Sequence, residues 1–250
     1  MSSKTIIEAK NITKQFERKI ALSSLSFSIK KGELVALIGP SGAGKTTLLN
    51  SIAGLVPLHS GELMIDSQPL GTYKRGRRFA KKIGVIRQQF DLIGPLAVIH
   101  NVLAGKLSEW GFIKSIFSLL IPQEKEVAIR ALERVGLKDK AYEITATLSG
   151  GEQQRVAMAR LLVQKPEIIL ADEPVASLDP ARADDVLAML TNIVTEEKQT
   201  LLASLHSVEY ARKYFTRIIS LKNGEIFFDL PTEKVTDELL NELYRLKEQV

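Results

Sequence analysis

The sequence predicts an α/β fold whose core is a mainly parallel sheet, with an N-terminal antiparallel β subdomain and an inserted subdomain of helices. Three observations in the 250 residues support this prediction. The apolar run at 34–38 leads into a glycine-rich turn at 39–46 and then into a helical pattern. Two more buried-strand runs, at 167–173 and 200–206, flank another helical pattern. Between 96 and 163, apolar residues instead recur every three or four positions, as they do on helices.

The other elements can be placed in chain order from their patterns. Residues 5–10 and 25–29 alternate apolar and polar side chains, which is typical of strands in a half-exposed sheet. The remaining predicted elements are a turn at 30–33, a helix at 45–54, strands at 61–66 and 82–88 separated by a basic run at 74–82, a helix at 180–197, a hairpin at 218–229 that turns at Asn223-Gly224, and a helix at 235–246.

This order of elements divides the chain into a core with two additions. The core is expected at about 1–88 and 164–230, the helical subdomain at about 89–163, and a C-terminal helix at about 232–248. No repeat and no low-complexity linker interrupts the pattern, so residues 1–250 are expected to form one domain.

Composition limits the classes of function to consider. The formal charge of +5 is mild, and bound nucleotide phosphates would account for it without any nucleic-acid partner. The basic run at 74–82 has only Phe79 as an interleaved aromatic residue, so a solvated face explains it better than a nucleic-acid patch. The absence of cysteine excludes thiol nucleophiles and zinc–thiolate sites. The N-terminus lacks a signal-peptide core and the apolar stretch at 112–121 is too short to cross a bilayer, so a soluble chain is expected.

Residues 39–46, GPSGAGKT, have the GxxxxGK[ST] spacing of a phosphate-binding P-loop. Glycines let the backbone curl so that N–H groups point at a phosphate chain, and the following helix adds its positive dipole end. Lys45 is expected to contact the β- and γ-phosphates, and Thr46 to offer its hydroxyl to Mg²⁺. The predicted phosphate-binding residues are Gly39, Pro40, Ser41, Gly42, Ala43, Gly44, Lys45, Thr46 and Thr47. The preceding strand and following helix argue against a chance match, so a nucleoside triphosphate is the expected ligand.

A second chemical signal is ILADEP at 169–174. Its apolar residues predict a central strand that delivers Asp172 and Glu173 to the edge of the sheet where ligands bind in open α/β folds. Asp172 is suited to hold Mg²⁺, directly or through water, beside Thr46. Glu173 could orient or deprotonate an attacking water. An ordinary acidic strand end would be the simpler interpretation if the P-loop were absent.

The third signal is LSGGEQQRVAMARLL at 148–162, a serine–glycine–glycine turn that begins a helix. Free N–H groups of this turn, with the Ser149 hydroxyl and the glycines Gly150 and Gly151, predict a second anion site. The turn lies in the inserted subdomain, so two chains arranged head to tail are expected to bring both anion sites to one phosphate. In order with the two phosphate motifs, these residues resemble the ATP-binding-cassette family, whose signature is LSGGQ. Glu152 stands where the signature has glutamine.

The resemblance covers the whole chain and matches Gln88 to the glutamine of the loop that joins core and helical subdomain. In that family the glutamine senses Mg²⁺ and the attacking water and passes the change to a membrane partner. The adjacent Gln89 leaves the register open by one residue. Arg87 stands where a hydrophobic residue is more usual, and the sequence offers no reason for it.

Three more residues receive roles from the resemblance alone. Asp179, in the SLD segment at 177–179, is matched to the loop that crosses the dimer interface. His206 is matched to a histidine that hydrogen-bonds the γ-phosphate. Phe16 is matched to the aromatic residue that stacks on adenine, with an ordinary core phenylalanine as the alternative.

The resemblance also implies an assembly. ATP and Mg²⁺ would be the ligands of a homodimer that closes on two ATP molecules. The partners would be integral membrane permease subunits and, indirectly, an extracytoplasmic solute-binding protein, but no nucleic acid. The chain would then be a peripheral protein on the cytoplasmic face of the inner membrane.

Within the family, the apolar insert at 109–126 and the phrase SLHSVEYARKY resemble the ATPase subunits of phosphonate importers. That branch also handles related reduced phosphorus anions such as phosphite. One alternative is a transporter ATPase for another solute, such as an amino acid or a lipoprotein. The other is a soluble cassette ATPase of translation or DNA repair, which usually has two cassettes, a long coiled coil or a zinc insertion.

Overall fold

The computed structural model describes residues 4–17, 19–73, 76–111, 114–116, 118, 122–176 and 178–245. Parts of four predicted features lie outside these residues: Lys74 and Arg75 of the basic run, Ser177 of the interface segment, most of the apolar stretch between 112 and 121, and the chain beyond 245. No helix in the described part of the chain is long and apolar enough to cross a membrane.

The larger of the two sheets has six strands in the order β10-β9-β3-β8-β7-β6. Its strands are β3 (Leu34–Ile38), β6 (Ile83–Ile86), β7 (Ile168–Asp172), β8 (Thr200–Ser204), β9 (Arg217–Lys222) and β10 (Glu225–Pro231). All neighbouring strands are parallel except β10, which forms an antiparallel hairpin with β9. The mainly parallel core that the sequence predicts is therefore confirmed.

The smaller sheet is antiparallel, in the order β2-β1-β4-β5. Its strands are β1 (Thr5–Phe16), β2 (Lys19–Lys30), β4 (Ser60–Ile65) and β5 (Gln68–Pro69). The first two strands extend well beyond the stretches predicted at 5–10 and 25–29, because register shifts let the pairing continue where the alternation of side chains breaks. This is the predicted N-terminal antiparallel subdomain, completed by strands that follow the P-loop helix.

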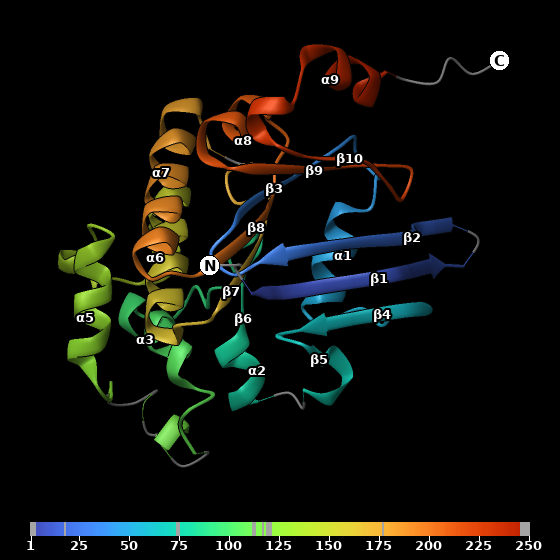
Figure 1. Cartoon of the computed structure of the whole chain (residues 1–250). Helices are drawn as coiled ribbons and strands as arrows, with labels where there is room; N and C mark the ends of the chain where they lie inside the picture. Colours follow the sequence, from blue (N-terminus) through green and yellow to red (C-terminus); the bar gives the residue numbers. More distant parts are fainter. Residues whose placement is uncertain are drawn as a thin grey trace.

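Helix α1 (Lys45–Ile52) lies between the two sheets (Figure 1). Alternate residues of β3 pack into two separate hydrophobic cores, because successive side chains of a strand point to opposite faces of the sheet. Val35 and Leu37 pack with α1 and the antiparallel sheet, whereas Ala36 and Ile38 face the other core. The P-loop between β3 and α1 is thereby fixed at both of its ends by buried side chains.

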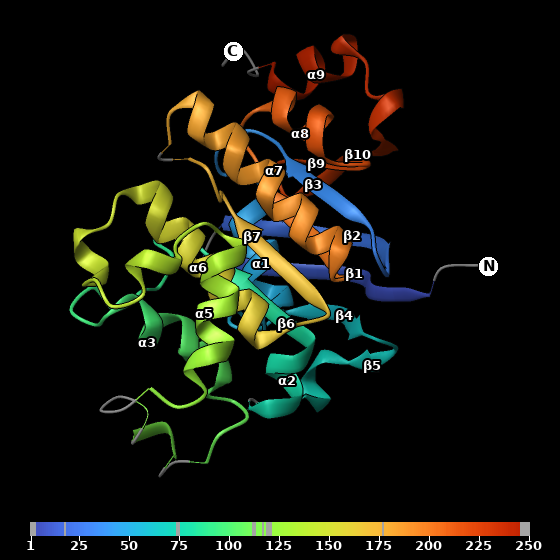
Figure 2. The ribbon, with the colours of Figure 1, turned by 90° about the vertical axis from the view of Figure 1, so that its left-hand side faces the viewer.

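Other helices in the described parts of the chain are α2 (Arg77–Lys82), α3 (Val98–Leu103), α5 (Lys125–Arg134), α6 (Gly150–Gln164), α7 (Pro180–Glu196), α8 (Val208–Tyr214) and α9 (Asp237–Tyr244), in addition to a short helical stretch at 114–116. Helices α6 and α7 cover the face of the larger sheet opposite α1, and α3 and α5 pack against α6 (Figures 1 and 2). The long helix α6 therefore joins the helical insertion to the sheet through one continuous hydrophobic core.

Two short helices differ from the sequence prediction. The basic run forms α2 at its end, with Phe79 packed towards α1, so the following strand is shorter than the predicted 82–88. Helix α8 is capped by Ser207, whose hydroxyl accepts a hydrogen bond from the Tyr210 N–H. Neither helix has two full turns of apolar periodicity, which is why the pattern of the sequence did not predict them.

Candidate functional site

The P-loop is shaped by close approaches that only glycine allows. Gly39, Gly42 and Gly44 all have positive φ angles, of 147°, 78° and 108°. A Cβ on Gly39 would lie 2.1 Å from the carbonyl oxygen of Leu221, and one on Gly44 would lie 2.4 Å from that of Ala21. Both contacts are with backbone atoms and cannot be relieved by a side-chain rotation. The glycine spacing in the motif thus follows from packing against β9 and β2.

Lys45 is a buried cation held against the carbonyl oxygens of the same loop. Its Nζ donates to Gly39 O at 2.6 Å and to Pro40 O at 3.2 Å. Burial lowers the pKa of Lys45, while the negative charges of Glu173 and Asp172 act in the opposite direction. An anion bound in the loop would supply the counter-charge that neutral carbonyls do not.

Asp172 ends β7 and is bonded from two neighbouring elements. Its Oδ1 accepts a hydrogen bond from Thr46 Oγ1 at 3.2 Å and from Ser204 Oγ at 2.7 Å. Ser204 Oγ in turn accepts from the Glu173 N–H at 2.9 Å. The sequence analysis missed Ser204, although a polar residue directly after the apolar run LLA of β8 was a signal. The predicted pairing of Thr46 with Asp172 is present.

The oxygens of Thr46 and Asp172 fit a Mg²⁺ site of the kind that uses few protein ligands. Mg²⁺ prefers hard oxygen donors and is commonly held by one or two carboxylates together with substrate phosphates. The described residues contain no group of three or more His, Cys, Asp or Glu side chains that could hold a metal by themselves. This pair could therefore hold Mg²⁺ only with phosphate or water oxygens completing the shell.

Glu173 and His206 form a close pair beside this carboxylate. His206 Nε2 and Glu173 Oε1 are 2.6 Å apart, which is hydrogen-bond distance. Glu173 has a positive φ of 50°, a conformation uncommon for a residue with a side chain and frequent at functional sites. The pair could accept or hold a proton at the mouth of the P-loop.

Lys45, Thr46, Glu173 and His206 line one pocket of about 500 Å³. The pocket is lined by Phe16, Lys19, Ala21, Ser41, Gly42, Ala43, Gly44, Lys45, Thr46, Thr47, Glu173 and His206. Phe16 is 47% exposed, so the alternative of a core phenylalanine is wrong, and the Lys14 ammonium lies 4.8 Å from its ring centroid. Lys19, which the sequence analysis missed, has its Nζ 3.6 Å from where a Cβ on Gly42 would be. A larger hollow of about 620 Å³ beyond the end of α1 is mainly apolar and lacks this chemistry.

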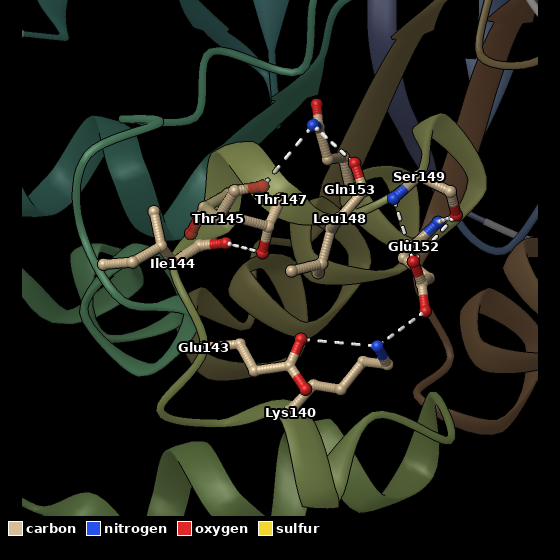
Figure 3. A network of polar contacts seen from close by, with 9 residues as sticks. All are labelled: Lys140, Glu143, Ile144, Thr145, Thr147, Leu148, Ser149, Glu152 and Gln153. Atoms are coloured by element: carbon tan, nitrogen blue, oxygen red, sulfur yellow. Dashed lines mark hydrogen bonds and ion pairs between the residues drawn. The ribbon is translucent and has the colours of Figure 1, made fainter.

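The serine–glycine–glycine turn lies elsewhere, at the start of α6 (Figure 3). Ser149 caps the helix and forms a reciprocal capping box with Glu152. The Ser149 N–H and Oγ each lie 2.8 Å from Glu152 Oε2. The Ser149 hydroxyl, expected to join the free N–H groups in an anion site, is thus engaged by Glu152 within the chain. The N–H groups of Gly150 and Gly151 lie in the first helical turn, where an α-helix has no internal acceptor for them.

Gln88 is exposed in the turn that follows β6 and does not line the pocket among the described residues. Arg160 of α6 fastens this turn by donating to Phe90 O and Asp91 O, both at 2.8 Å. Arg87 pairs with Asp91 at 3.3 Å, which gives this unusual residue a local role in the same turn. The turn that carries Gln88 is therefore tied to the helix that carries Ser149.

Asp179 also lies away from the pocket lining that the structure describes. It caps α7: its Oδ1 accepts from the Arg182 N–H at 3.1 Å, and its Oδ2 is 3.3 Å from Arg182 Nε. Within one chain this is a helix cap. Its predicted role at a dimer interface stays a prediction.

Comparison with known proteins identifies the family. A family model described as ABC transporter matches residues 22–176. The chain belongs to the ABC transporter family. A curated relative from Nostoc sp., named phosphonates import ATP-binding protein PhnC 1, is 45% identical over 98% of this chain and 94% of its own length. One of the same name from Pseudomonas aeruginosa is 44% identical over 96% of this chain and 88% of its own length.

Solved structures agree with the fold of this ABC ATPase. A nucleotide-free ATP-binding cassette from an ABC transporter has a TM-score of 0.78 at 26% identity, over 96% of this chain and 95% of that one. A dimeric bacterial ABC transporter cassette also has a TM-score of 0.78, at 33% identity, over 91% of this chain and 99% of that one. The predicted P-loop α/β fold with its β and helical subdomains is confirmed.

Ser204→Ala tests the carboxylate network around Asp172. The change removes a hydrogen bond to a carboxylate and leaves the partly buried N–H of Glu173 without its acceptor. Since such bonds contribute about 1.5–3 kcal/mol, we expect Mg²⁺-dependent ATP turnover to fall by roughly tenfold to a hundredfold while ATP binding is retained. Phosphate release and nucleotide-binding assays measure the two quantities.

The matched control is Ser220→Ala on β9, because Ser220 is also fully buried and exchanges two hydrogen bonds with Phe228 away from the pocket. It should lower the free energy of unfolding by about 1 kcal/mol and leave turnover near wild type. Equal turnover of the two variants would contradict a role for Ser204 in positioning Asp172 and Glu173.

Proposed function

We propose that this ABC ATPase is the nucleotide-hydrolysing subunit of a membrane importer and works as a head-to-tail dimer around two ATP molecules. The observation that carries the proposal is the pocket beside the P-loop, where a buried lysine, a hydroxyl–carboxylate pair and a Glu–His pair converge. Family membership and the curated relatives, named as import ATP-binding proteins, support the same function.

ATP would bind with its phosphates along the P-loop. Lys45 would exchange its carbonyl partners for the β- and γ-phosphates, and residues 39–47 would supply backbone N–H groups. Phe16, exposed at the pocket, would stack on adenine. Mg²⁺, when bound by Thr46, Asp172 and the approaching Gln88, would neutralise charge that develops on the phosphates.

Hydrolysis needs a group that accepts a proton from water. Glu173 meets this need, because its side chain lines the pocket and its backbone is fixed through Ser204. His206, bonded to Glu173 at 2.6 Å, would hold that carboxylate until the γ-phosphate offers the imidazole another partner. A general base typically contributes a factor of 10²–10⁴ to the rate.

A second chain would complete each site. The pocket lining contains neither Ser149, Gly150 nor Gly151 among the described residues, yet their helix start suits an anion. In a head-to-tail dimer, this turn of one chain would cover the phosphate bound by the other, with Asp179 near the interface. The similar cassette that was solved as a dimer supports such an assembly.

The membrane partners follow from the import function. The described residues hold no helix that could span a membrane, so permease subunits would form the pathway and this chain would bind them at the cytoplasmic face of the inner membrane. An extracytoplasmic solute-binding protein would deliver the solute. The names of the curated relatives support a phosphonate or a related reduced phosphorus anion as that solute.

Glu173→Gln tests the hydrolytic role. The amide keeps the size of the side chain but cannot take a proton from water, so we expect turnover to fall by roughly 10²–10⁴-fold. ATP and Mg²⁺ should still bind and should convert the protein to a long-lived dimer, seen by sedimentation. Lys45→Ala is the control that should lose ATP binding itself. Near-wild-type phosphate release from Glu173→Gln would rule out this base.

The substrate is tested in cells that carry the whole transporter. Deleting the gene should abolish growth on a phosphonate or phosphite as the sole phosphorus source and leave growth on orthophosphate unchanged. Restoration by the wild-type gene but not by Lys45→Ala would tie the phenotype to ATP use. If the partner binding protein instead prefers an amino acid or a metal complex, the phosphorus-anion substrate is wrong and only the general importer function stands.

A further inference from the structure

The turn at Ser149 already binds a negatively charged group, the carboxylate of Glu152 from the same chain. Glu152 Oε2 lies 2.8 Å from both the backbone nitrogen and the hydroxyl of Ser149. Its other oxygen, Oε1, lies 3.3 Å from Lys140 Nζ, and the same ammonium lies 3.3 Å from Glu143 Oε2. Figure 3 shows these four side chains as one connected network beside the start of α6.

The single hydrogen of the Ser149 hydroxyl limits what this turn can bind in a dimer. A hydroxyl has one hydrogen, and that of Ser149 points to Glu152. The hydroxyl can therefore donate to a phosphate of the partner chain only after it leaves this carboxylate. Glu152 also remains ionised: the Ser149 backbone N–H, then its hydroxyl and Lys140, all lower the pKa of Glu152. An incoming phosphate would thus meet a negative charge as well as an occupied donor.

We propose that Glu152 is an internal competitor for the signature turn and that Lys140 is a positioning residue that relieves the competition. When the partner's phosphate takes the Ser149 hydroxyl, the carboxylate keeps its contact with Lys140, which offsets the repulsion between the two anions. The inference rests on the head-to-tail dimer proposed above. The affinity of the dimer then depends on Lys140, which lies outside both the P-loop pocket and the Ser149–Gly151 turn.

The position of Lys140 suits this role. It ends a short 3₁₀ turn, Lys138–Lys140, that packs against α5, so its backbone belongs to a different element from α6. The side chains of Lys140 and Glu152 are 37% and 29% exposed, which leaves the ion pair partly screened but free to rearrange. Glu143, the second carboxylate on Lys140, keeps the ammonium on this side of the turn.

The test measures the dissociation constant of the Mg²⁺-ATP dimer in the Glu173→Gln background. Lys140→Met should raise the dissociation constant of the dimer by roughly tenfold. This is roughly threefold for each of the two Ser149 turns in the dimer, as expected for the loss of one partly exposed charge contact at each turn. Glu152→Gln should strengthen the dimer by a similar factor, because the amide can still cap Ser149 without a charge. In the Glu152→Gln protein, the added Lys140→Met should have no effect.

Controls separate this role from a general loss of charge or stability. Lys138→Met removes an equal charge two residues away, where Lys138 pairs with Glu133 at 2.9 Å, and should leave the dimer unchanged. Lys140→Arg keeps the charge and should keep the wild-type affinity. The difference in dimer affinity between Lys140→Met and the parent should shrink at high salt. ATP binding to the monomer should be the same in every variant.

The possible outcomes have distinct meanings. If Glu173→Gln alone forms no ATP-dependent dimer, the proposed function fails and this inference fails with it. If the dimer forms but Lys140→Met and Glu152→Gln leave its affinity unchanged, or act additively, only the role of the Lys140–Glu152 network is overturned.

Discussion

The parallel alignment of three neighbouring strands determines where the chemistry of this protein can occur. Leu37 of β3 is in register with Ser204 of β8, and Ser204 is in register with Asp172 of β7. The three strands therefore end at the same edge of the sheet. This alignment brings the carboxylate that bonds Thr46 and the Glu173–His206 pair to the P-loop, although Asp172 lies 126 residues from Thr46 in the sequence. If β7 were shifted by one residue, Asp172 would point to the opposite face.

The second organising feature is that the two anion-binding turns are attached to different cores. The P-loop is fixed between the two sheets, whereas the Ser149 turn begins the helix that joins the helical insertion to the larger sheet. Arg160, on that same helix, fastens the turn that carries Gln88. A movement of α6 would consequently displace both the signature turn and the Gln88 turn, which is the physical link that the proposed coupling between nucleotide and permease would need.

The sequence predicted best what depends on local spacing. The glycines and lysine of the P-loop follow from a motif of eight residues, and their close approaches to Leu221 and Ala21 explain why glycine is required. What depended on pairing between distant strands was predicted only in part: Asp172 and Thr46 were expected to be neighbours, but Ser204 was missed because its role follows from the register of β8.

Other differences have equally specific causes. The Ser149–Glu152 pair fits the pattern of a capping box as well as that of an anion site, and spacing alone does not say which partner occupies the turn. Helices α2 and α8 are too short to show a period. The exposure of Phe16 excludes the interpretation as a core residue and leaves the one in which it stacks on adenine. Exposure depends on the assembled fold and could not be predicted from local sequence.

The central claim is that each ATP site is shared between two chains, and mixing two inactive variants tests it most directly. In the Glu173→Gln background, Lys45→Ala disables only the P-loop and Ser149→Arg disables only the signature turn. Neither variant alone should retain ATP in a dimer. A mixture of the two should retain one ATP for every two chains, because one of the two shared sites combines an intact P-loop with an intact signature turn. If the dimers in the mixture retain no more ATP than those of either variant alone, the shared site is contradicted.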